Sequence, residues 1–497
     1  MDQGKTAPYS TTALRRELSG FRETTSPLFP DVTLDQILTE VTICKMVKDS
    51  VKRQVFYLQA PCGNFFLKRI VLIRDKDRLR HLLLPGRRWA EWRNLHKLGS
   101  AGISAARPVL KGEKPDGHPE VFFLVTEKVD GSPLRYESLA IAETLGRYIG
   151  LLHLRGVYHA DLHPENLIIQ NNGHPCLIDV QEVLFLPWLP RRIRIYNLGK
   201  LYFRIRSQLQ SDRWSAAFLR SYNSMGKKKI IPFELNRAAD RHQQIHYRSR
   251  SKRCCKNSTE FAVVKGIHFH GYKRRSFHWG KRELRQALEE GKVVKKNRVI
   301  NFQGVNIKIY RKRMFHRDRC LASWKISRAL EVRNIAVPQS LAYFVMNGYS
   351  FFLSEFIVDS ILLNDYLSSL SAEPHKRRAI KKLALWVKQI HDNHIWQRDF
   401  KSSNILCRKG DYLMVDLDDV TIRGRLPDKK KIVNLAQLNA SLSNAITIKD
   451  RLRFFFYYMA DEKPSRQRRR AIYRKVWEIT LSKDTSYFDL DIDKLKI

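Results

Sequence analysis

The chain has 497 residues, and its 43% hydrophobic and 28% charged content is typical of folded globular proteins, which excludes a largely disordered chain. The length is sufficient for two or three domains that each bury a core. Lys and Arg number 91 against 49 Asp and Glu, so the net charge is +42. This field attracts anionic partners, namely nucleic acid, an anionic membrane face or an acidic glycolipid, and it disfavours polycationic ligands.

The seven cysteines are odd in number and form no C-x2-C pair. The sequence therefore predicts neither a disulfide framework nor a zinc site, and a reducing compartment is expected. The first twenty residues lack the apolar core of a signal peptide, and no run of about eighteen apolar residues occurs. We expect a cytoplasmic protein, or one that is peripheral on the inner face of the cytoplasmic membrane.

The first predicted domain follows a polar N-terminal segment. Residues 1–35 contain three prolines and are expected to form a loose arm, in which Leu14 to Phe21 could be a short helix, and residues 36–230 form the domain. Between 42 and 73, apolar and β-branched runs alternate with turn residues, which predicts antiparallel strands. Lys68 lies between apolar residues of the last strand, where its charge could reach nucleotide phosphates. A solvated lysine on an edge strand is the alternative.

Helices and a further strand follow Lys68. Apolar spacing predicts a helix over 89–98 and an amphipathic helix over 139–154. Glu91 near the start of the first helix could pair with Lys68 and orient it, and an unpaired surface glutamate is the alternative. The apolar run between the helices ends at Glu127. We expect this end to be a hinge whose backbone receives an adenine ring.

The loop after the second helix carries the candidate chemistry. Asp161 is followed by Asn166, and the next apolar run ends at Asp179. Phosphoryl transfer asks a protein mainly for positioning and charge neutralisation around a metal-bound nucleotide. Asp161 could accept the proton of an attacking hydroxyl, and Asn166 and Asp179 offer oxygen ligands to Mg²⁺. For a single motif of this kind, a polar surface turn is the alternative.

The same pattern occurs a second time. The three polar residues return after 237 or 238 residues as Asp399, Asn404 and Asp416. A period of this length indicates a duplicated domain, because solenoid repeats are far shorter. The basic segment 231–258 has weak periodicity and is expected to be a linker, so 259–497 would form the second domain.

The second domain repeats most of the nucleotide-site pattern. Lys308 lies in a strand that matches the strand of the first lysine, and Glu355 ends a second hinge-like run. Ser323 occupies the position of the helix glutamate and cannot form an ion pair with Lys308, which makes the second nucleotide site less complete. Lys401 follows Asp399 by two residues and can help neutralise a transferring phosphoryl group. A degraded, non-catalytic second domain is the alternative.

Several motifs carry a resemblance to a known family. They are Ala90-Glu91-Trp92-Arg93, His159-x-Asp161-Leu162-His163, and Ile178-Asp179 followed by Asn197-Leu198-x-x-Leu201. They resemble the lipopolysaccharide kinase family, which includes kinases of inner-core heptose and of 3-deoxy-manno-octulosonic acid, over about residues 40–225 and again over 290–450. The resemblance implies an α+β fold of two tandem protein-kinase-like domains, each with an antiparallel-sheet lobe and a mainly helical lobe, and it implies ATP and Mg²⁺ as cofactors.

Three features depart from ordinary protein kinases. No glycine-rich G-x-G-x-x-G loop precedes Lys68, and Val180-Gln181 stands where Phe-Gly would follow the metal-binding aspartate. No Ala-Pro-Glu follows that aspartate either. Because this segment docks peptide substrates in protein kinases, a protein substrate is disfavoured.

The resemblance implies phosphorylation of a core-sugar hydroxyl, with the lipopolysaccharide core or a lipid A precursor as substrate. An anionic inner-membrane surface is the expected partner, nucleic acid is disfavoured, and no obligate protein partner is inferred. The aromatic run 454–459 and the basic segment 463–475 could seat the protein on such a membrane, and a core helix followed by a solvated helix is the alternative. Two other functions stay open: a small-molecule kinase resembling aminoglycoside phosphotransferases, and a pseudokinase pair that binds anionic membrane or nucleic acid as a scaffold.

Overall fold

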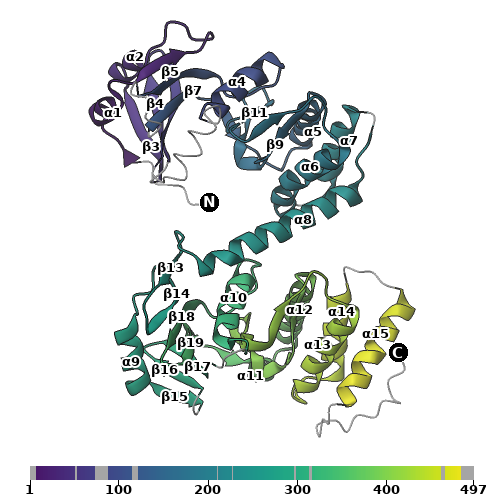
Figure 1. Cartoon of the computed structure of the whole chain (residues 1–497). Coiled ribbons are helices and arrows are strands. Elements are labelled where there is room, and N and C mark those ends of the chain that lie inside the picture. The colour runs from purple at the N-terminus through teal and green to yellow at the C-terminus, as the bar shows by residue number, and fades with distance from the viewer. Residues whose placement is uncertain are drawn as a thin grey trace. The chain divides into compact units, whose positions relative to one another are not determined.

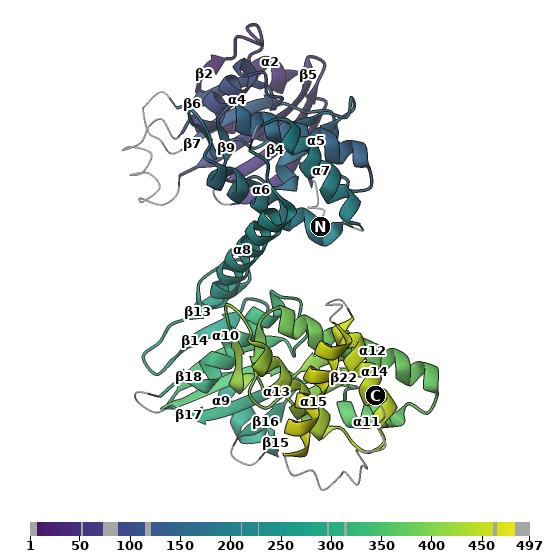
Figure 2. The same ribbon diagram turned by 90° about the vertical axis from the view of Figure 1, so that its right-hand side faces the viewer.

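The computed structural model divides the chain into two compact units, Met1–Gln244 and Ile245–Ile497, which we call the first and second halves. Each half has a sheet lobe followed by a mainly helical lobe, which confirms the expected α+β fold of two tandem domains. Figures 1 and 2 show the elements of each half. The structure describes residues 7–50, 53–72, 88–114, 121–209, 211–226, 228–295, 298–312, 316–460 and 465–482.

The sheet lobe of the first half is a seven-stranded antiparallel sheet in the order β1-β3-β4-β5-β7-β6-β2. Three helices accompany it: α1 (Thr11–Leu18), α2 (Leu34–Thr39) and α4 (Ala90–Ser100). The strands are β1 (Ala7–Pro8), β2 (Arg22–Thr25), β3 (Ile43–Ser50), β4 (Arg53–Ala60), β5 (Gly63–Val71), β6 (Pro108–Glu113) and β7 (Val121–Glu127).

The N-terminal segment is folded, and the expectation of a loose arm over 1–35 is wrong from residue 7 onwards. Ser10 caps α1 by accepting a hydrogen bond from the backbone of the first turn. Leu14 and Phe21 are buried in the core of the sheet lobe, where the Phe21 ring lies 5.4 Å from that of Phe123. Buried side chains of α1 and α2, Phe21, and the pairing of β1 and β2 within the sheet therefore hold this polar, proline-containing segment on the sheet lobe (Figure 1).

The helical lobe of the first half packs α5 against α7. Gly146 of α5 allows this contact, because a Cβ atom there would lie 2.3 Å from the Phe218 carbonyl oxygen. Two small sheets, β11-β10-β8 and β12-β9, carry the loops between the lobes. The elements are β8 (Gly131–Pro133), α5 (Leu139–Leu154), β9 (Val157–His159), η2 (Pro164–Asn166), β10 (Leu167–Gln170), β11 (Pro175–Leu177), β12 (Val183–Phe185), α6 (Arg191–Ile205), η3 (Arg206–Gln208) and α7 (Asp212–Ser224).

The segment expected as a linker contains the helix α8 (Pro232–Ser251) and the short η4 (Lys252–Cys255). The division between the halves falls inside α8. Leu235 and Ala239 pack in the core of the first half, whereas Cys254 packs in a core cluster of the second. This basic segment is therefore helical, with α8 contributing to the core of the first half and η4 to a core cluster of the second.

The second half repeats the topology. Its seven-stranded sheet has the order β13-β14-β18-β19-β17-β16-β15, so the path β16-β17-β19-β18 corresponds to β4-β5-β7-β6. The elements of this lobe are β13 (Phe261–Val264), β14 (Phe269–Arg274), α9 (Lys281–Glu290), β15 (Lys292–Lys295), β16 (Val299–Phe302), β17 (Val305–Arg311), α10 (Arg319–Glu331), β18 (Ser340–Met346) and β19 (Tyr349–Glu355).

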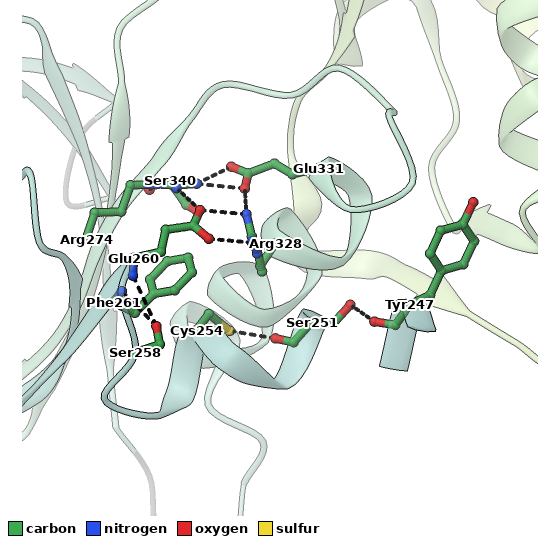
Figure 3. Close-up of polar contacts among 10 residues, drawn as sticks. All are labelled: Tyr247, Ser251, Cys254, Ser258, Glu260, Phe261, Arg274, Arg328, Glu331 and Ser340. Carbon is green, nitrogen blue, oxygen red and sulfur yellow. Dashed lines mark hydrogen bonds and ion pairs between the residues drawn. The ribbon is translucent and has the colours of Figure 1, made fainter. Parts of the chain in front are cut away.

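Ion pairs around the buried Arg274 connect α10 to the sheet of the second half (Figure 3). Arg274 of β14 pairs with Glu260 at 2.8 Å and with Glu331 of α10 at 2.6 Å. Arg328 of α10 also pairs with Glu260, at 2.6 Å. Both guanidinium groups lie 5.1 Å from the centre of the Phe261 ring. Two arginines that share two carboxylates and one aromatic face leave α10 little freedom to move relative to β13 and β14.

The helical lobe of the second half buries the aromatic run that the sequence offered as a membrane contact. Phe455, Tyr458 and Met459 of α14 lie in its core, so the core-helix alternative holds for them, whereas Phe456 is exposed. The elements, most of them visible in Figure 2, are β20 (Ile361–Leu362), α11 (Leu363–Ser369), α12 (Glu373–Asp392), β21 (Ile395–Gln397), η5 (Ser402–Asn404), β22 (Ile405–Arg408), β23 (Asp411–Met414), η6 (Leu417–Asp419), β24 (Val420–Ile422), α13 (Asp428–Ser441), α14 (Ile448–Met459) and α15 (Arg466–Leu481).

None of the helices in the described part of the chain combines the length and the apolar character needed to cross a bilayer.

The packing of the N-terminal segment can be tested by truncating its buried leucine. We expect Leu14→Ala to lower the free energy of unfolding by about 2–5 kcal/mol, because the cavity opens in the core of the sheet lobe. Leu28→Ala is the matched control, since this side chain is 57% exposed and its loss should cost less than about 0.5 kcal/mol. Urea denaturation measures both, and equal stabilities for the two variants would mean that the segment is loose after all.

Candidate active site

A buried ion pair connects strand β5 and helix α4 in the sheet lobe of the first half. Lys68 of β5 and Glu91 in the first turn of α4 are both buried and form the ion pair expected from the sequence. Lys68 Nζ also donates to the Ile178 carbonyl oxygen at 3.5 Å. Asn94, one turn further along α4, donates to the Val180 carbonyl oxygen at 2.8 Å. Helix α4 therefore holds both the lysine and the segment that carries Asp179.

The loop of Asp161 is held by its own side chains. The Asp161 amide donates to His159 Nδ1 at 3.1 Å, and Asn166 Nδ2 donates to the Asp161 carbonyl oxygen at 3.0 Å. Burial lowers the pKa of His159 to about 4, so its ring is neutral and Nδ1 can accept that bond. The Asp161 carboxylate is half exposed and points to Lys200 Nζ at 2.8 Å and to His163 Nε2 at 3.4 Å. The aspartate is thus fixed by its backbone while its carboxylate stays accessible.

A chain of hydrogen bonds supports this loop from the helices behind it. Asn197 of α6 donates to the His159 carbonyl oxygen at 2.7 Å. The Asn197 side-chain oxygen accepts from His153 Nε2 at 3.1 Å, and His153 Nδ1 lies 2.8 Å from the Tyr222 hydroxyl. Burial lowers the pKa of His153 to about 4, so this histidine is also neutral. Side chains from α5, α6 and α7 thereby fix the position of the loop.

Asn166 and Asp179 lie side by side, because the Ile178 amide donates to the Asn166 carbonyl oxygen at 3.1 Å. The Asn166 amide nitrogen is used by the loop, which leaves its oxygen for a ligand. Burial acts to raise the pKa of Asp179, but Lys68 and Arg53 bring it below its usual range, with Arg53 at 3.4 Å. An ionised carboxylate beside an amide oxygen fits Mg²⁺.

Among the described residues, no group of three or more His, Cys, Asp or Glu side chains could hold a metal ion by itself. A Mg²⁺ ion at Asn166 and Asp179 would therefore take its remaining ligands from water and from phosphate oxygens. This is the usual manner in which Mg²⁺ is held where phosphoryl groups are transferred.

The lysine of the second half pairs with carboxylates of the loop after β23, and not with a residue of the helix. Lys308 Nζ lies 2.7 Å from Asp416 and 3.5 Å from Asp418, which stands two residues later. Ser323 of α10, at the position of the glutamate in α4, donates to Asp418 at 2.8 Å, and the Tyr310 hydroxyl also donates to Asp418. Burial acts to raise the pKa of Asp418, but Lys308 and the two hydroxyls bring it below its usual range.

Sequence reasoning missed Asp418. It treated Ser323 as a loss, whereas the structure shows that the partner of Lys308 comes from the loop after β23. The signal was present as the spacing Asp416-x-Asp418, together with a serine in the helix short enough to leave room for the second carboxylate.

The remaining loop geometry of the second half repeats the first. Asn404 Nδ2 donates to the Asp399 carbonyl oxygen at 2.8 Å, and the Val415 amide donates to the Asn404 carbonyl oxygen at 3.0 Å. Asp416 has a left-handed backbone, with φ of 57°. Gln397 replaces the loop histidine and donates to the Asp416 carbonyl oxygen at 3.0 Å. The structure thus brings Asp399, Asn404 and Asp416 together as predicted.

Each half holds one lysine against its loop aspartate, but from different elements. In the second half, Lys401 of the loop itself lies 2.7 Å from Asp399. In the first half the contact comes from Lys200 of α6, far along the chain. The residue equivalent to Lys200 is Gln437, which donates to the Arg398 carbonyl oxygen at 2.7 Å. The sequence predicted Lys401 and missed Lys200, since only the fold brings α6 to the loop.

The two expected hinge residues lie at equivalent strand ends. The Glu127 amide donates to the Arg107 carbonyl oxygen and the Glu355 amide to that of Gln339, each at 2.9 Å. The Glu127 carboxylate also pairs with the Arg107 side chain. Because these groups bond within the lobe, contacts to an adenine ring would fall to neighbouring backbone groups, and the hinge role of Glu127 and Glu355 stays a prediction.

The relocated ion pair gives a stability prediction. Asp418→Asn should lower the free energy of unfolding of the second half by about 1–3 kcal/mol, because Lys308 loses a partner that is almost fully buried. Adding Ser323→Glu should restore most of that loss, since a glutamate at the matching position of α4 reaches its lysine. Asp419→Asn, on the same short helix and exposed, is the control. Thermal unfolding measures the stability of all three variants. If Ser323→Glu does not restore the stability that Asp418→Asn loses, Asp418 does not take the place of the helix glutamate.

The neutral histidines give a pH prediction. The pKa of His153 in the folded protein is about 4 against an ordinary 6.5, so below 6.5 the unfolded chain binds protons that the folded state refuses. Stability is fully present above pH 6.5 and should fall towards pH 4 by at most about 1.4 kcal/mol per pH unit for this residue. His153→Gln should flatten the profile by that amount, and His174→Gln, which changes an exposed histidine, should not. Urea unfolding at several pH values measures this, and an unchanged slope in His153→Gln would contradict it.

Comparison with known proteins agrees with this duplicated site. The model of the lipopolysaccharide kinase (Kdo/WaaP) family matches residues 61–222 and again 280–458, which together are more than half of the chain. A search of curated protein sequences finds no match.

Solved structures with a similar fold include WaaP in complex with acyl carrier protein, at 17% identity over 45% of this chain and 99% of that chain, with a TM-score of 0.34. The bifunctional kinase-methyltransferase WbdD matches at 15% identity over 44% of this chain and 51% of that chain, with a TM-score of 0.28. An aminoglycoside phosphotransferase from Alicyclobacillus acidocaldarius matches at 12% identity over 45% of this chain and 85% of that chain, with a TM-score of 0.31.

The family match covers the strand of Lys68 and the loop of Asp161 in its first segment, and their counterparts around Lys308 and Asp399 in its second. A kinase family implies ATP as the phosphoryl donor. The chain belongs to the lipopolysaccharide kinase (Kdo/WaaP) family and carries two tandem, protein-kinase-like copies of the family's domain.

Proposed function

We propose that this kinase transfers the γ-phosphate of ATP, with Mg²⁺, to a hydroxyl of a lipopolysaccharide core sugar, either heptose or 3-deoxy-manno-octulosonic acid, at the inner face of the cytoplasmic membrane. The observation that carries the proposal is the repeated loop geometry in a chain of this family. In both halves the loop asparagine donates to the carbonyl oxygen of the loop aspartate, and the next strand delivers a second aspartate beside it.

In the first half, Asp161 would act as the base. Burial acts to raise the pKa of Asp161, but Lys200 and His163 bring it below its usual range, so the carboxylate is ionised and can accept the proton of a sugar hydroxyl. Its side chain is half exposed, as access by an acceptor requires. Lys68 would contact the phosphates while Glu91 orients it.

Asn166 and Asp179 would hold Mg²⁺, which when bound neutralises charge on the phosphates. In the second half, Asn404 and Asp416 would take the metal-binding role and Lys308 the phosphate role. Asp399 would be the base. Lys401 lies close enough to Asp399 to stabilise negative charge on a transferring phosphoryl group as well.

The charge of the chain supports an anionic acceptor. A net charge of +42 attracts a core sugar that carries carboxylates or phosphates, and an anionic membrane surface as well. The same charge disfavours an aminoglycoside-like polycation. Exposed arginines on α15 add to the positive surface of the second half, although its aromatic neighbours in α14 are largely buried.

The proposal is tested by transfer of label from γ-labelled ATP to purified core lipid. We expect Asp161→Asn and Asp399→Asn each to lower transfer at one sugar position by about 100-fold or more, because each removes one base, and the double variant to be inactive. Asp35→Asn, which changes an exposed aspartate of α2 in the sheet lobe, is the control. No transfer by the wild type, or full transfer by the double variant, would refute the proposal and favour a pseudokinase scaffold.

A further inference from the structure

The first half exposes apolar side chains next to its catalytic loop. Leu184 of β12 is 56% exposed, and Leu186 and Trp188 in the segment that follows are 36% and 69% exposed. Leu154, the last residue of α5, is 62% exposed. Monomeric proteins scatter single apolar residues over their surface, but four large ones in two adjoining segments form a patch that calls for a partner.

These residues are held together by the backbone on which the loop depends. Strand β12 pairs with β9, the strand that leads into the Asp161 loop. The Leu186 amide donates to the Gly156 carbonyl oxygen at 2.9 Å. Gly156 has φ of 72°, and a Cβ atom there would lie 1.9 Å from the Leu186 carbonyl oxygen. The end of α5 and the segment after β12 therefore pack closely together beside the loop.

The second half shows that the fold does not require apolar residues here. Its β24 pairs with β21 in the same register, and the Arg423 amide donates to the His394 carbonyl oxygen at 3.1 Å, as Leu186 does to Gly156. A buried leucine and a proline then precede the next helix in both halves. The four positions are polar in the second half: Asp392, Thr421, Arg423 and Arg425.

Cations border the apolar side chains. Lys97 Nζ lies 5.5 Å from the centre of the ring of Phe185, the last residue of β12. Arg155, directly after Leu154, and Arg192, in the first turn of α6, are both exposed. Leucine and tryptophan framed by lysine and arginine are typical of segments that enter the interface of an anionic bilayer, where apolar groups reach the acyl boundary and cations meet the headgroups.

We propose that the patch of Leu154, Leu184, Leu186 and Trp188 inserts into the surface of an anionic lipid bilayer. The inference rests on the proposed function and deepens it: the bilayer contact would place the Asp161 loop against acceptors that are anchored in the membrane. The second half, which carries Asp392, Thr421, Arg423 and Arg425 at these positions, has no apolar group to insert there and would receive a soluble anionic acceptor. The two catalytic loops would thereby differ in how an acceptor reaches them.

The experiment measures co-sedimentation of the full chain with vesicles of phosphatidylcholine and phosphatidylglycerol in equal parts, at low and high salt. Leu186→Ser combined with Trp188→Ser should weaken binding by about tenfold, with the larger effect at high salt, where electrostatic attraction is screened and the apolar contribution remains. Phe233→Ser is the matched control, because Phe233 of α8 is also 69% exposed. It should bind as the wild type does.

A second variant tests the same patch in case the double serine variant does not fold. Leu154→Asp introduces the residue that the second half carries at this position, so the fold tolerates it, and it should also weaken vesicle binding. An unchanged melting temperature of each variant confirms folding. Wild-type binding by both variants would overturn the proposal and would mean that the patch contacts something other than lipid.

Transfer of phosphate by the wild type to a soluble, deacylated core sugar tests the proposed function separately. Absence of that transfer would count against the function, whereas vesicle binding that does not depend on the patch would count against this inference.

Discussion

A lysine that is buried or half-buried beside the catalytic loop needs a carboxylate next to it, because an unpaired charge that is removed from water costs several kcal/mol. This constraint organises both halves of the chain. In the first half Glu91 of α4 supplies the carboxylate, and the same helix reaches the Asp179 segment through Asn94. In the second half Asp416 and Asp418 supply it together from the loop after β23, and Ser323 of α10 has become a hydrogen-bond donor to Asp418.

The two halves differ in which element positions the lysine. A glutamate on α4 makes the position of the first lysine depend on the position of a helix. A carboxylate two residues after Asp416 makes the second lysine depend on the metal-binding loop itself, while buried arginine pairs fix α10 independently to β13 and β14. The exchange of Lys200 for Lys401 follows the same logic, since one lysine near the loop aspartate is kept and its origin along the chain is free to change.

The sequence was sufficient where the chemistry is local or repeated. The spacing from Asp161 to Asn166 and its return near residue 400 located both loops and indicated a duplicated domain, whereas the α+β fold was implied by the resemblance to the lipopolysaccharide kinase family. The pairing of Lys68 with Glu91 was also predicted. The sequence was insufficient where tertiary packing determines the structure. Leu14 and Phe21 are buried in the sheet lobe and hold a segment whose composition suggests a loose arm.

Contacts between residues far apart in the sequence could not be predicted either. Asp418 compensates for Ser323 across nearly a hundred residues, and Lys200 reaches Asp161 only because α6 packs behind the loop. A substitution that removes a partner in the sequence is therefore not evidence of a lost site, because the fold can supply the missing charge from another element. The serine in α10 argued against the second nucleotide site in the sequence, and the structure removes that argument.

The central claim is that both halves are complete nucleotide sites, and the most direct test is the binding stoichiometry of a non-hydrolysable ATP analogue with Mg²⁺ by isothermal titration calorimetry. The account predicts two nucleotides per chain, with one site lost in Lys68→Ala and the other lost in Lys308→Ala. A single nucleotide per wild-type chain, unaffected by Lys308→Ala, would show that the relocated carboxylate stabilises a domain that no longer binds nucleotide.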